Sequence, residues 1–287
     1  MPTDEKEQDR LDLHHEILVE LFGGELHKAP IPDDVERILD IGTGTGIWAI
    51  DMARKYPGAE IVGTDLSPIQ ITWAPENCRF EVDDAERDWI GSLFRSDSYD
   101  FIHARNLAQA VTDWEKVLGE AYRCCKPGGY VELSEVGTTL KSDDGTLGPD
   151  HKLKLCMDAL ESALMKIGRP PASPGLLKQR LENAGFVDIK QYMHKQPIGP
   201  WPKDQRLRRV GAMALMAAET GVNAYAMGAL TRINSMSAEE ATRMCEEGLA
   251  DCKNKNYHIY THHYIAYGRK PDHVGCAAQS IADVHFR

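Results

Sequence analysis

A short stretch near the N-terminus, "ILDIGTGTGIWAID" at residues 38–51, combines an acid with glycines at alternate positions. Its pattern D-x-G-x-G-x-G is formed by Asp40, Gly42, Gly44 and Gly46. A glycine-rich turn between a strand and a helix lets a ligand contact backbone amides at the helix N-terminus. Each glycine costs about 1 kcal/mol in regular structure, and the sequence shows no packing reason that would offset this cost. We therefore expect a small molecule to bind against this turn.

The spacing of the glycines indicates which ligand the turn holds. A dinucleotide site with the pattern G-x-G-x-x-G, counted from Gly42, requires glycine at position 47, where this chain has Ile47. A phosphate-binding P-loop is excluded because no Gly-Lys-Ser/Thr follows the glycines. The spacing resembles motif I of the class I S-adenosylmethionine (SAM)-dependent methyltransferases. SAM suits the turn because it has no phosphates, its carboxylate can face the amides, and its ammonium can reach Asp40.

Acidic residues after the next two predicted strands add to the same site. Asp65 follows the glycines at an interval of about twenty residues, where an acid accepts hydrogen bonds from both ribose hydroxyls, and Leu66 would lie beside the adenine. In the methyltransferase pattern, Asp83 or Asp84 receives the adenine amino group, and we favour Asp84. Ala85 would offer its backbone amide to the ring. By the same resemblance, two more residues of the glycine segment are expected to contact the cofactor, Thr43 and Trp48.

Polar residues that could act on the methyl acceptor follow the fourth and fifth predicted strands. His103 and Arg105 share one face of the strand that ends in "HARNL", and Glu135 follows the next strand. We expect these catalytic candidates at the carboxyl ends of the strands, where such sheets bind ligands. His103 is equally well interpreted as a core histidine, whereas Arg105 is expected to position a ligand, including the cofactor. No catalytic triad is needed, because a sulfonium already activates its methyl group and the enzyme must align the acceptor and exclude water.

One histidine cluster has a spacing that a metal ion could use. It consists of His258, His262 and His263. His262 and His263 are neighbours on an alternating segment and should point to opposite faces of a strand. We interpret the cluster as structural or surface residues and expect no metal site.

The composition argues against several classes of partner. The 287 residues carry a net charge of -11, so we expect no nucleic-acid partner, and the basic stretch at 205–210 is interpreted as a solvated helix face. No apolar run approaches the length of a membrane span. The seven cysteines lack framework spacing and the N-terminal segment is acidic and polar, which indicates a cytoplasmic or nuclear protein with reduced thiols.

The hydrophobic pattern predicts an α/β fold. Short apolar strands alternate with helices from residue 36 onward, which indicates a doubly wound, mostly parallel sheet of seven strands. A helix is expected at 114–129, only a turn or two of helix at 86–98, and a capping box at Ser237 and Glu240. The expected divisions are an N-terminal lid helix and linker at 1–30, a main domain at 31–271 with a helical cap at about 200–250 before the last strand, and a tail at 272–287.

A series of segments along nearly the whole chain resembles the fungal LaeA-like (UMTA-type) methyltransferases. In order, they are "DRLDLHHEIL", "GGELHKAPI", "ILDIGTGTGIWAIDMA", "GTDLSPIQ", "NCRFEVDDAE", "FIHARNL", "KPGGYVELSE", "SDDGTL", "GPWPKD" and "YGRKP". The family usually has proline where this chain has "ITW" at 71–73. The resemblance implies a Rossmann-like class I fold and a lid over the cofactor around Arg10, His14 and His15, with His14 among the cofactor contacts. The methionine-rich segment 211–230 would cap the acceptor pocket, and plain helical core is an equal interpretation.

Together these observations predict a SAM-dependent methyltransferase. We expect it to transfer a methyl group to a small, largely apolar secondary metabolite and to release S-adenosylhomocysteine (SAH). The resemblance also implies an alternative, a LaeA-like nuclear regulator of secondary metabolism and development that acts through velvet-type protein partners. A third interpretation has SAM bound without transfer of its methyl group.

Overall fold

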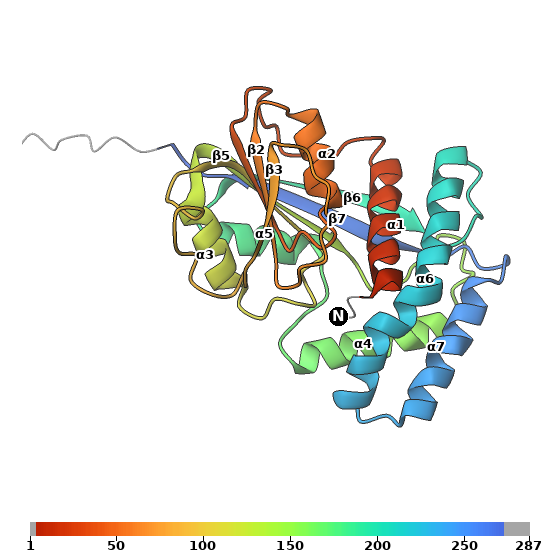
Figure 1. The fold of residues 1–287 in the computed structure, drawn as a ribbon. Helices are drawn as coiled ribbons and strands as arrows, with labels where there is room; N and C mark the ends of the chain where they lie inside the picture. The colour runs from red at the N-terminus through yellow and green to blue at the C-terminus, as the bar shows by residue number, and fades with distance from the viewer. Residues whose placement is uncertain (1–3, 273–287) are drawn as a thin grey trace, which may run out of the picture.

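The chain folds around one mixed sheet, seen in the computed structural model of residues 4–272 (Figure 1). The strand order is β3-β2-β1-β4-β5-β7-β6. The strands are β1 (Arg37–Ile41), β2 (Glu60–Asp65), β3 (Cys78–Val82), β4 (Tyr99–Arg105), β5 (Cys125–Val136), β6 (Val187–Pro197) and β7 (Tyr260–Arg269). The first five are parallel, and β7 inserts antiparallel between β5 and β6. The predicted doubly wound, mostly parallel seven-stranded sheet is confirmed.

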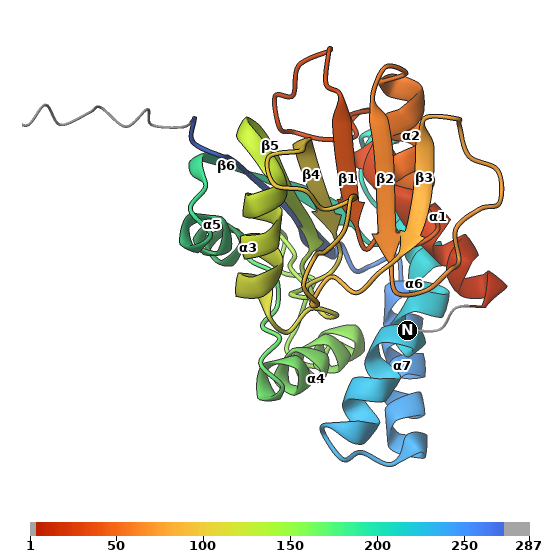
Figure 2. The same cartoon turned by 60° about the vertical axis from the view of Figure 1, so that its left-hand side comes forward.

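Helices cover both faces of the sheet and the end at which the parallel strands finish. They are α1 (Glu5–Leu21), α2 (Ile47–Lys55), α3 (Trp114–Cys124), α4 (Lys152–Lys166), α5 (Pro174–Asn183), α6 (Gln205–Arg232) and α7 (Ala238–Cys252). Figure 2 shows α3 and α5 on one face, and α2 with α1 on the other. Each face has its own core, one including Val117 and Leu177 and the other including Ala49 and Ile61. Two buried faces explain the mostly apolar, buried strands β1, β2 and β4, whereas the edge strands β3 and β6 carry exposed polar side chains.

The helical cap lies at the carboxyl ends of the parallel strands. In Figure 2 the arrowheads of β2 and β3 point toward the layer that contains α6 and α7. α6 is a single helix of 28 residues that packs against α1, and α4 packs against α7. The cap thus precedes the last strand, as predicted. Among the described helices, none is both long and apolar enough to cross a membrane.

Local signals explain where the elements begin and end. Ser237 and Glu240 form the predicted capping box at the start of α7, and no helix forms at 86–98. The helix expected at 114–129 is shorter than predicted, because α3 ends at Cys124 and β5 begins at the next residue. Pro127 disfavours helical geometry at the residue before it, which ends the helix early. The predicted tail at 272–287 lies, except for its first residue, outside the described residues.

Candidate active site

The glycine turn joins β1 to α2, and each of its three positions requires glycine for a different physical reason. Gly42, Gly44 and Gly46 all have left-handed backbones, with φ of 65°, 60° and 83°. A Cβ on Gly42 would lie 2.4 Å from the Leu107 side chain, and one on Gly46 would lie 2.3 Å from the Phe80 ring. The expectation that these glycines lack a packing reason is therefore wrong for Gly42 and Gly46. At Gly44 only a Leu11 atom lies near, at 3.6 Å, so this glycine leaves open space.

That open space belongs to a cavity of about 250 Å³, which we call the glycine pocket. Ten of the predicted cofactor residues line it, namely His14, Gly42, Thr43, Gly44, Asp65, Leu66, Asp83, Asp84, Ala85 and Arg105. They come from α1, the glycine turn and the ends of β2, β3 and β4. The structure therefore brings together residues that are up to 91 positions apart in the sequence, from His14 to Arg105.

Backbone amides orient the carboxylates of the glycine pocket. The two oxygens of Asp65 accept hydrogen bonds from the N–H groups of Gly44 at 2.9 Å and Ser67 at 3.0 Å. Asp84 accepts from the N–H of Glu86 at 3.0 Å. With Asp83, Asp84, Glu86 and Asp65 along its wall, the pocket carries an excess of acids. Such a wall favours a cationic ligand with hydroxyl or amino donors, which fits the sulfonium, ammonium, ribose and adenine of SAM.

Three predicted cofactor residues lie behind the glycine pocket rather than in it. Asp40 is buried, and its two oxygens bond to Thr43 Oγ1 at 2.6 Å and His103 Nδ1 at 2.8 Å. Trp48 stacks on the His103 ring with centroids 3.8 Å apart. Gly46 faces Phe80, as described above. Asp40 therefore shapes the glycine turn through Thr43, and His103 lies in this layer rather than in either large pocket.

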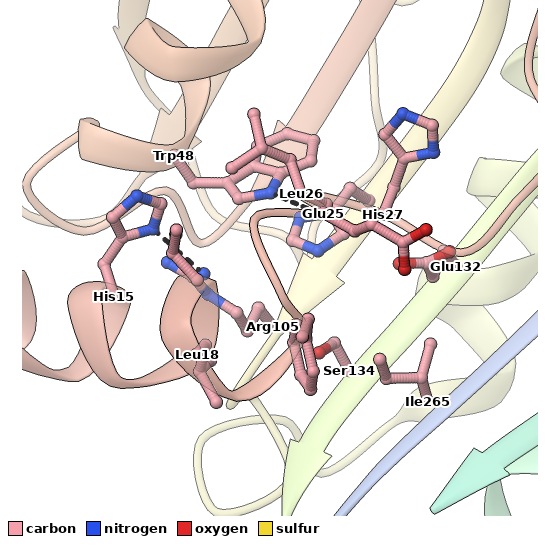
Figure 3. A pocket seen from close by; sticks show the side chains of 13 residues that line it. His15, Leu18, Glu25, Leu26, His27, Trp48, Arg105, Glu132, Ser134 and Ile265 are labelled. Carbon is pink, nitrogen blue, oxygen red and sulfur yellow. Dashed lines mark hydrogen bonds between the residues drawn. The ribbon is translucent and has the colours of Figure 1, made fainter. Parts of the chain in front are cut away.

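Arg105 connects the glycine pocket to a small buried cavity beneath α1 (Figure 3). The cavity measures about 10 Å³, which is room for roughly one water molecule. In Figure 3 the Arg105 guanidinium points at His15, and it donates to His15 Nδ1 at 3.2 Å. His15 Nε2 bonds to Asp51 at 3.0 Å. Arg105 is thus held between α1 and the cofactor wall by a partly buried chain of polar contacts.

A second, larger cavity of about 420 Å³ lies under the helical cap, and we call it the cap pocket. Its walls are mostly apolar and include Leu140, Leu153, Met157, Leu160 and Ile198, together with small residues of α6, Ala214, Ala217, Ala218 and Gly221. The small α6 residues create the volume. The methionine-rich segment does cap this pocket, but through its alanines and glycine. Met216 is exposed, and Met213 packs toward α1.

Glu135 is the predicted catalytic residue that reaches the cap pocket. Its side chain is buried, and Oε1 accepts from the N–H groups of Leu107 at 2.8 Å and Ala108 at 3.1 Å. Burial raises the pKa of Glu135 to about 7 despite these two hydrogen bonds. Near neutral pH the group therefore exchanges readily between carboxylate and carboxylic acid, as a general base requires.

The two pockets meet at a seam formed by His14, Asn106, Ala110 and Tyr225, which line both cavities. Tyr225 of α6 accepts a hydrogen bond from Arg10 of α1 at 3.0 Å. Sequence reasoning missed Asn106 and Tyr225. The available signals were the position of Asn106 inside "HARNL" and the fact that Tyr225 is the only aromatic residue in the segment 211–230.

The two neighbouring histidines of β7, His262 and His263, have separate surroundings, as the alternation predicts. His263 Nε2 bonds to Ser134 at 2.8 Å, whereas the His262 ring packs between Tyr260 and Tyr264. His258 bonds to Asp144 at the surface. Within residues 4–272, no three His, Cys, Asp or Glu side chains are grouped in a way that could hold a metal ion.

Comparisons with known proteins show the family of this chain. A family model described as a methyltransferase domain matches residues 13–191. The chain is similar to "Methyltransferase pytC" of Aspergillus terreus, with 37% identity over 94% of this chain and 82% of that protein. It is also similar to "Secondary metabolism regulator LAE1" of Cochliobolus heterostrophus, with 36% identity over 94% of this chain and 89% of that protein.

Solved structures support the fold. A Haemonchus contortus phosphoethanolamine N-methyltransferase 2, solved with SAH, aligns with a TM-score of 0.51 and 20% identity. The alignment covers 90% of this chain and 53% of that chain. At this identity the likeness concerns the sheet and its helices.

Proposed function

The chain belongs to the methyltransferase domain family and is a SAM-dependent methyltransferase, and we propose that its acceptor is a small, largely apolar secondary metabolite. The observation that carries the proposal is the cap pocket, which opens onto the glycine pocket at the seam. Its volume of about 420 Å³ is within the range of small-molecule sites, about 300–1,000 Å³. When bound, SAM supplies an activated methyl group, whose carbon–sulfur bond breaks with the electron pair left on sulfur.

The glycine pocket would hold the cofactor. We assign the ribose hydroxyls to Asp65, the adenine amino group to Asp84 with Asp83 beside it, and the adenine ring to Leu66 and the amide of Ala85. The open space at Gly44 admits the amino-acid part of SAM, and Arg105 provides a positive charge for its carboxylate. Asp40, Gly46, Trp48 and His103 would act indirectly, by setting the shape of the turn.

We assign the proton-accepting role to Glu135. It lines the cap pocket beside the turn that leads to the seam, and its raised pKa suits proton transfer near neutral pH. The carboxylate would take the proton that an acidic acceptor atom must lose on methylation. The apolar wall of the pocket and the close packing of α1 on α6 would exclude water from the reacting atoms.

Isothermal calorimetry with SAH tests the cofactor assignment. The wild type should bind SAH, and Gly44→Asp should lose binding by about a hundredfold or more, because its carboxylate enters the open space. Gly58→Asp is the matched control, since Gly58 lies on an exposed turn with nothing within 4 Å of its Cβ direction. Equal binding by all three proteins would rule out the assignment. Incubation with labelled SAM and a host metabolite extract, followed by mass spectrometry, would then identify the acceptor.

A second candidate function comes from the LAE1 relative, which is named a regulator and is covered over 89% of its length. In this reading the chain would work in the nucleus, in a stable complex with a velvet-type protein. Pull-down from native extract would recover such a partner in stoichiometric amount. Labelled-methyl turnover measured on the same complex would separate a regulator that transfers methyl groups from one that only binds SAM.

A further inference from the structure

Two adjacent histidines of α1 contact the end of β4 and the residue after it, each through its own Nδ1 atom. His15 Nδ1 receives a hydrogen bond from Arg105, and His14 Nδ1 lies 3.2 Å from Asn106 Nδ2. A ring nitrogen that accepts a hydrogen bond carries no proton, so the neutral ring must carry its proton on Nε2. The tautomer of His14 therefore depends on which end of the Asn106 amide faces it.

The orientation of the Asn106 amide is set by the backbone. Asn106 Oδ1 accepts a hydrogen bond from the N–H of Val136 at 3.3 Å, which leaves Nδ2 to face His14. The residue is held in place by its own N–H, which donates to the Ser134 carbonyl at 2.9 Å. Its φ of 57° is left-handed, a conformation that asparagine tolerates better than most residues. The turn after β4 thus forces a donor onto His14 Nδ1 and the imidazole proton onto Nε2.

The Nε2–H groups of the two histidines have different surroundings. His15 uses Nε2 to bond Asp51, within the partly buried chain that holds Arg105. His14 Nε2 has no hydrogen bond to any residue that the structure describes, and His14 lines the seam between the two pockets. His14 thus has an N–H donor left for a ligand, and it belongs to the seam, where methyl donor and methyl acceptor would meet.

The charge around His14 keeps its ring neutral. Burial, together with the nearby Arg105 and Arg10, lowers the pKa of His14 to about 3. A cationic sulfonium in the adjoining pocket would oppose protonation further. His14 consequently cannot serve as a general base through Nε2, which already carries the proton, and it does not act as a cation.

Resting on the proposed function, we propose that His14 is a hydrogen-bond donor to the methyl acceptor, and that the acceptor pairs a hydroxyl with a neighbouring carbonyl oxygen. The hydroxyl would face Glu135 and the carbonyl would face His14. Both residues flank one turn, since His14 bonds to Asn106 and Glu135 bonds to the N–H groups of Leu107 and Ala108. The cofactor carboxylate is the poorer partner for His14, because Arg105 lines the glycine pocket and offers it a full charge.

The tautomer can be measured without any ligand. Long-range proton–nitrogen NMR spectra of the full chain, labelled with nitrogen-15 histidine, should show His14 Nδ1 unprotonated and Nε2 protonated at pH 7. Asn106→Asp should move the proton to Nδ1, because a carboxylate in place of the amide accepts instead of donating. His14→Gln identifies the resonance by removing it. A cationic His14, or a proton on Nδ1 in the wild type, would overturn the proposal.

The substrate class is tested with a matched pair of probes, 2-hydroxyacetophenone and 2-ethylphenol, titrated in the presence of SAH. The first has a carbonyl beside its hydroxyl and the second lacks it. Only the first should shift the His14 Nε2–H resonance and bind measurably tighter, by about fivefold to tenfold, the worth of one hydrogen bond. Equal effects of the two probes, or no shift by either, would contradict the assigned class.

Variants separate this inference from the function on which it rests. His14→Leu should abolish the preference for the carbonyl probe when each protein is saturated with SAH, a condition chosen because His14 also lines the glycine pocket. His14→Gln, which keeps an N–H near the Nε2 position, should restore part of the preference. His258→Gln on the exposed surface is the control. Loss of SAH binding in His14→Leu with probe preference intact would reassign His14 to the cofactor. Failure of the wild type to bind SAH would instead refute the cofactor site.

Discussion

Glu132 and Glu135 lie on the same strand and have nearly the same local chemistry, yet they open onto very different spaces. Each is 1% exposed, and each accepts hydrogen bonds from two consecutive backbone N–H groups. Burial raises the pKa of both to about 7. Because they are three positions apart on β5, they point to opposite faces of the sheet. Glu132 lines the buried cavity of about 10 Å³, and Glu135 lines the cap pocket of about 420 Å³.

A shifted pKa alone therefore does not identify a catalytic group. Both glutamates are equally perturbed, but only Glu135 adjoins a space that admits a second molecule. Glu132 ties the linker after α1 to the sheet by accepting from the N–H groups of Lys28 and Ala29. We infer a structural role for Glu132 and a chemical role for Glu135, and the following substitutions test that division.

The largest expected effect is on turnover. Glu135→Gln preserves the hydrogen bonds to the turn after β4 but cannot take a proton, so the rate of methyl transfer should fall by about 10²–10⁴-fold. Glu132→Gln is the matched control and should leave the rate nearly unchanged. Labelled-methyl transfer from SAM to the identified acceptor measures both. An equal loss of transfer rate in the two variants would show that Glu132 and Glu135 do not differ in role.

The next effect is on the pH dependence of stability, where the two sites should behave alike. Both carboxyls have a folded pKa near 7 against an ordinary value of 4.5, so the unfolded chain loses the proton first as pH rises. Stability should therefore fall between about pH 4.5 and 7, by up to about 3 kcal/mol for each group. Urea unfolding at pH 5 and pH 8 should show that the unfolding free energy falls less in Glu132→Gln and in Glu135→Gln than in the wild type. An unchanged pH dependence in either variant would show that its carboxyl is not perturbed.

The smallest effect concerns truncation. Glu132→Ala should cost about 2–3 kcal/mol of unfolding free energy, because it leaves two N–H groups without partners in a closed space. Glu135→Ala should cost about 1 kcal/mol less, since water in the cap pocket can reach the exposed N–H groups. Chemical denaturation at pH 5, where both carboxyls are largely protonated, gives the comparison. A larger cost at Glu135 would indicate that the cap pocket is drier than its volume suggests.

Sequence reasoning recovered the glycine pocket better than the cap pocket, and the reason is physical. The ends of neighbouring parallel strands meet at one edge of a sheet, so Gly44, Asp65 and Asp84 could be grouped from the strand pattern alone. Asp40 and Trp48 were assigned to the cofactor by motif, but the motif does not say which side chains turn inward. Burial of Asp40 against His103 depends on the packing of α2, which a local pattern does not encode.

The seam could not be predicted because it depends on how α1 and α6 pack over the sheet. His14 and Tyr225 come from elements far apart in the chain, and their meeting point is set by tertiary contacts. Period-two alternation along β4 selects His103 and Arg105 and gives no reason to include Asn106, which follows the strand. The strand ends at Arg105, and the left-handed turn at Asn106 redirects the next side chains toward α1 and the cap.

The position of β7 also determines when the sheet can form completely during synthesis. β6 is an edge strand whose partner in the described sheet is β7 alone, and β7 is made more than sixty residues later, after α6 and α7. A nascent chain therefore exposes β6 and an uncovered flank of β5 until Tyr260–Arg269 has emerged from the ribosome. A chain cut short before this segment would lose Thr261 from the cap pocket together with the strand that joins β5 to β6, and we expect it to be aggregation-prone.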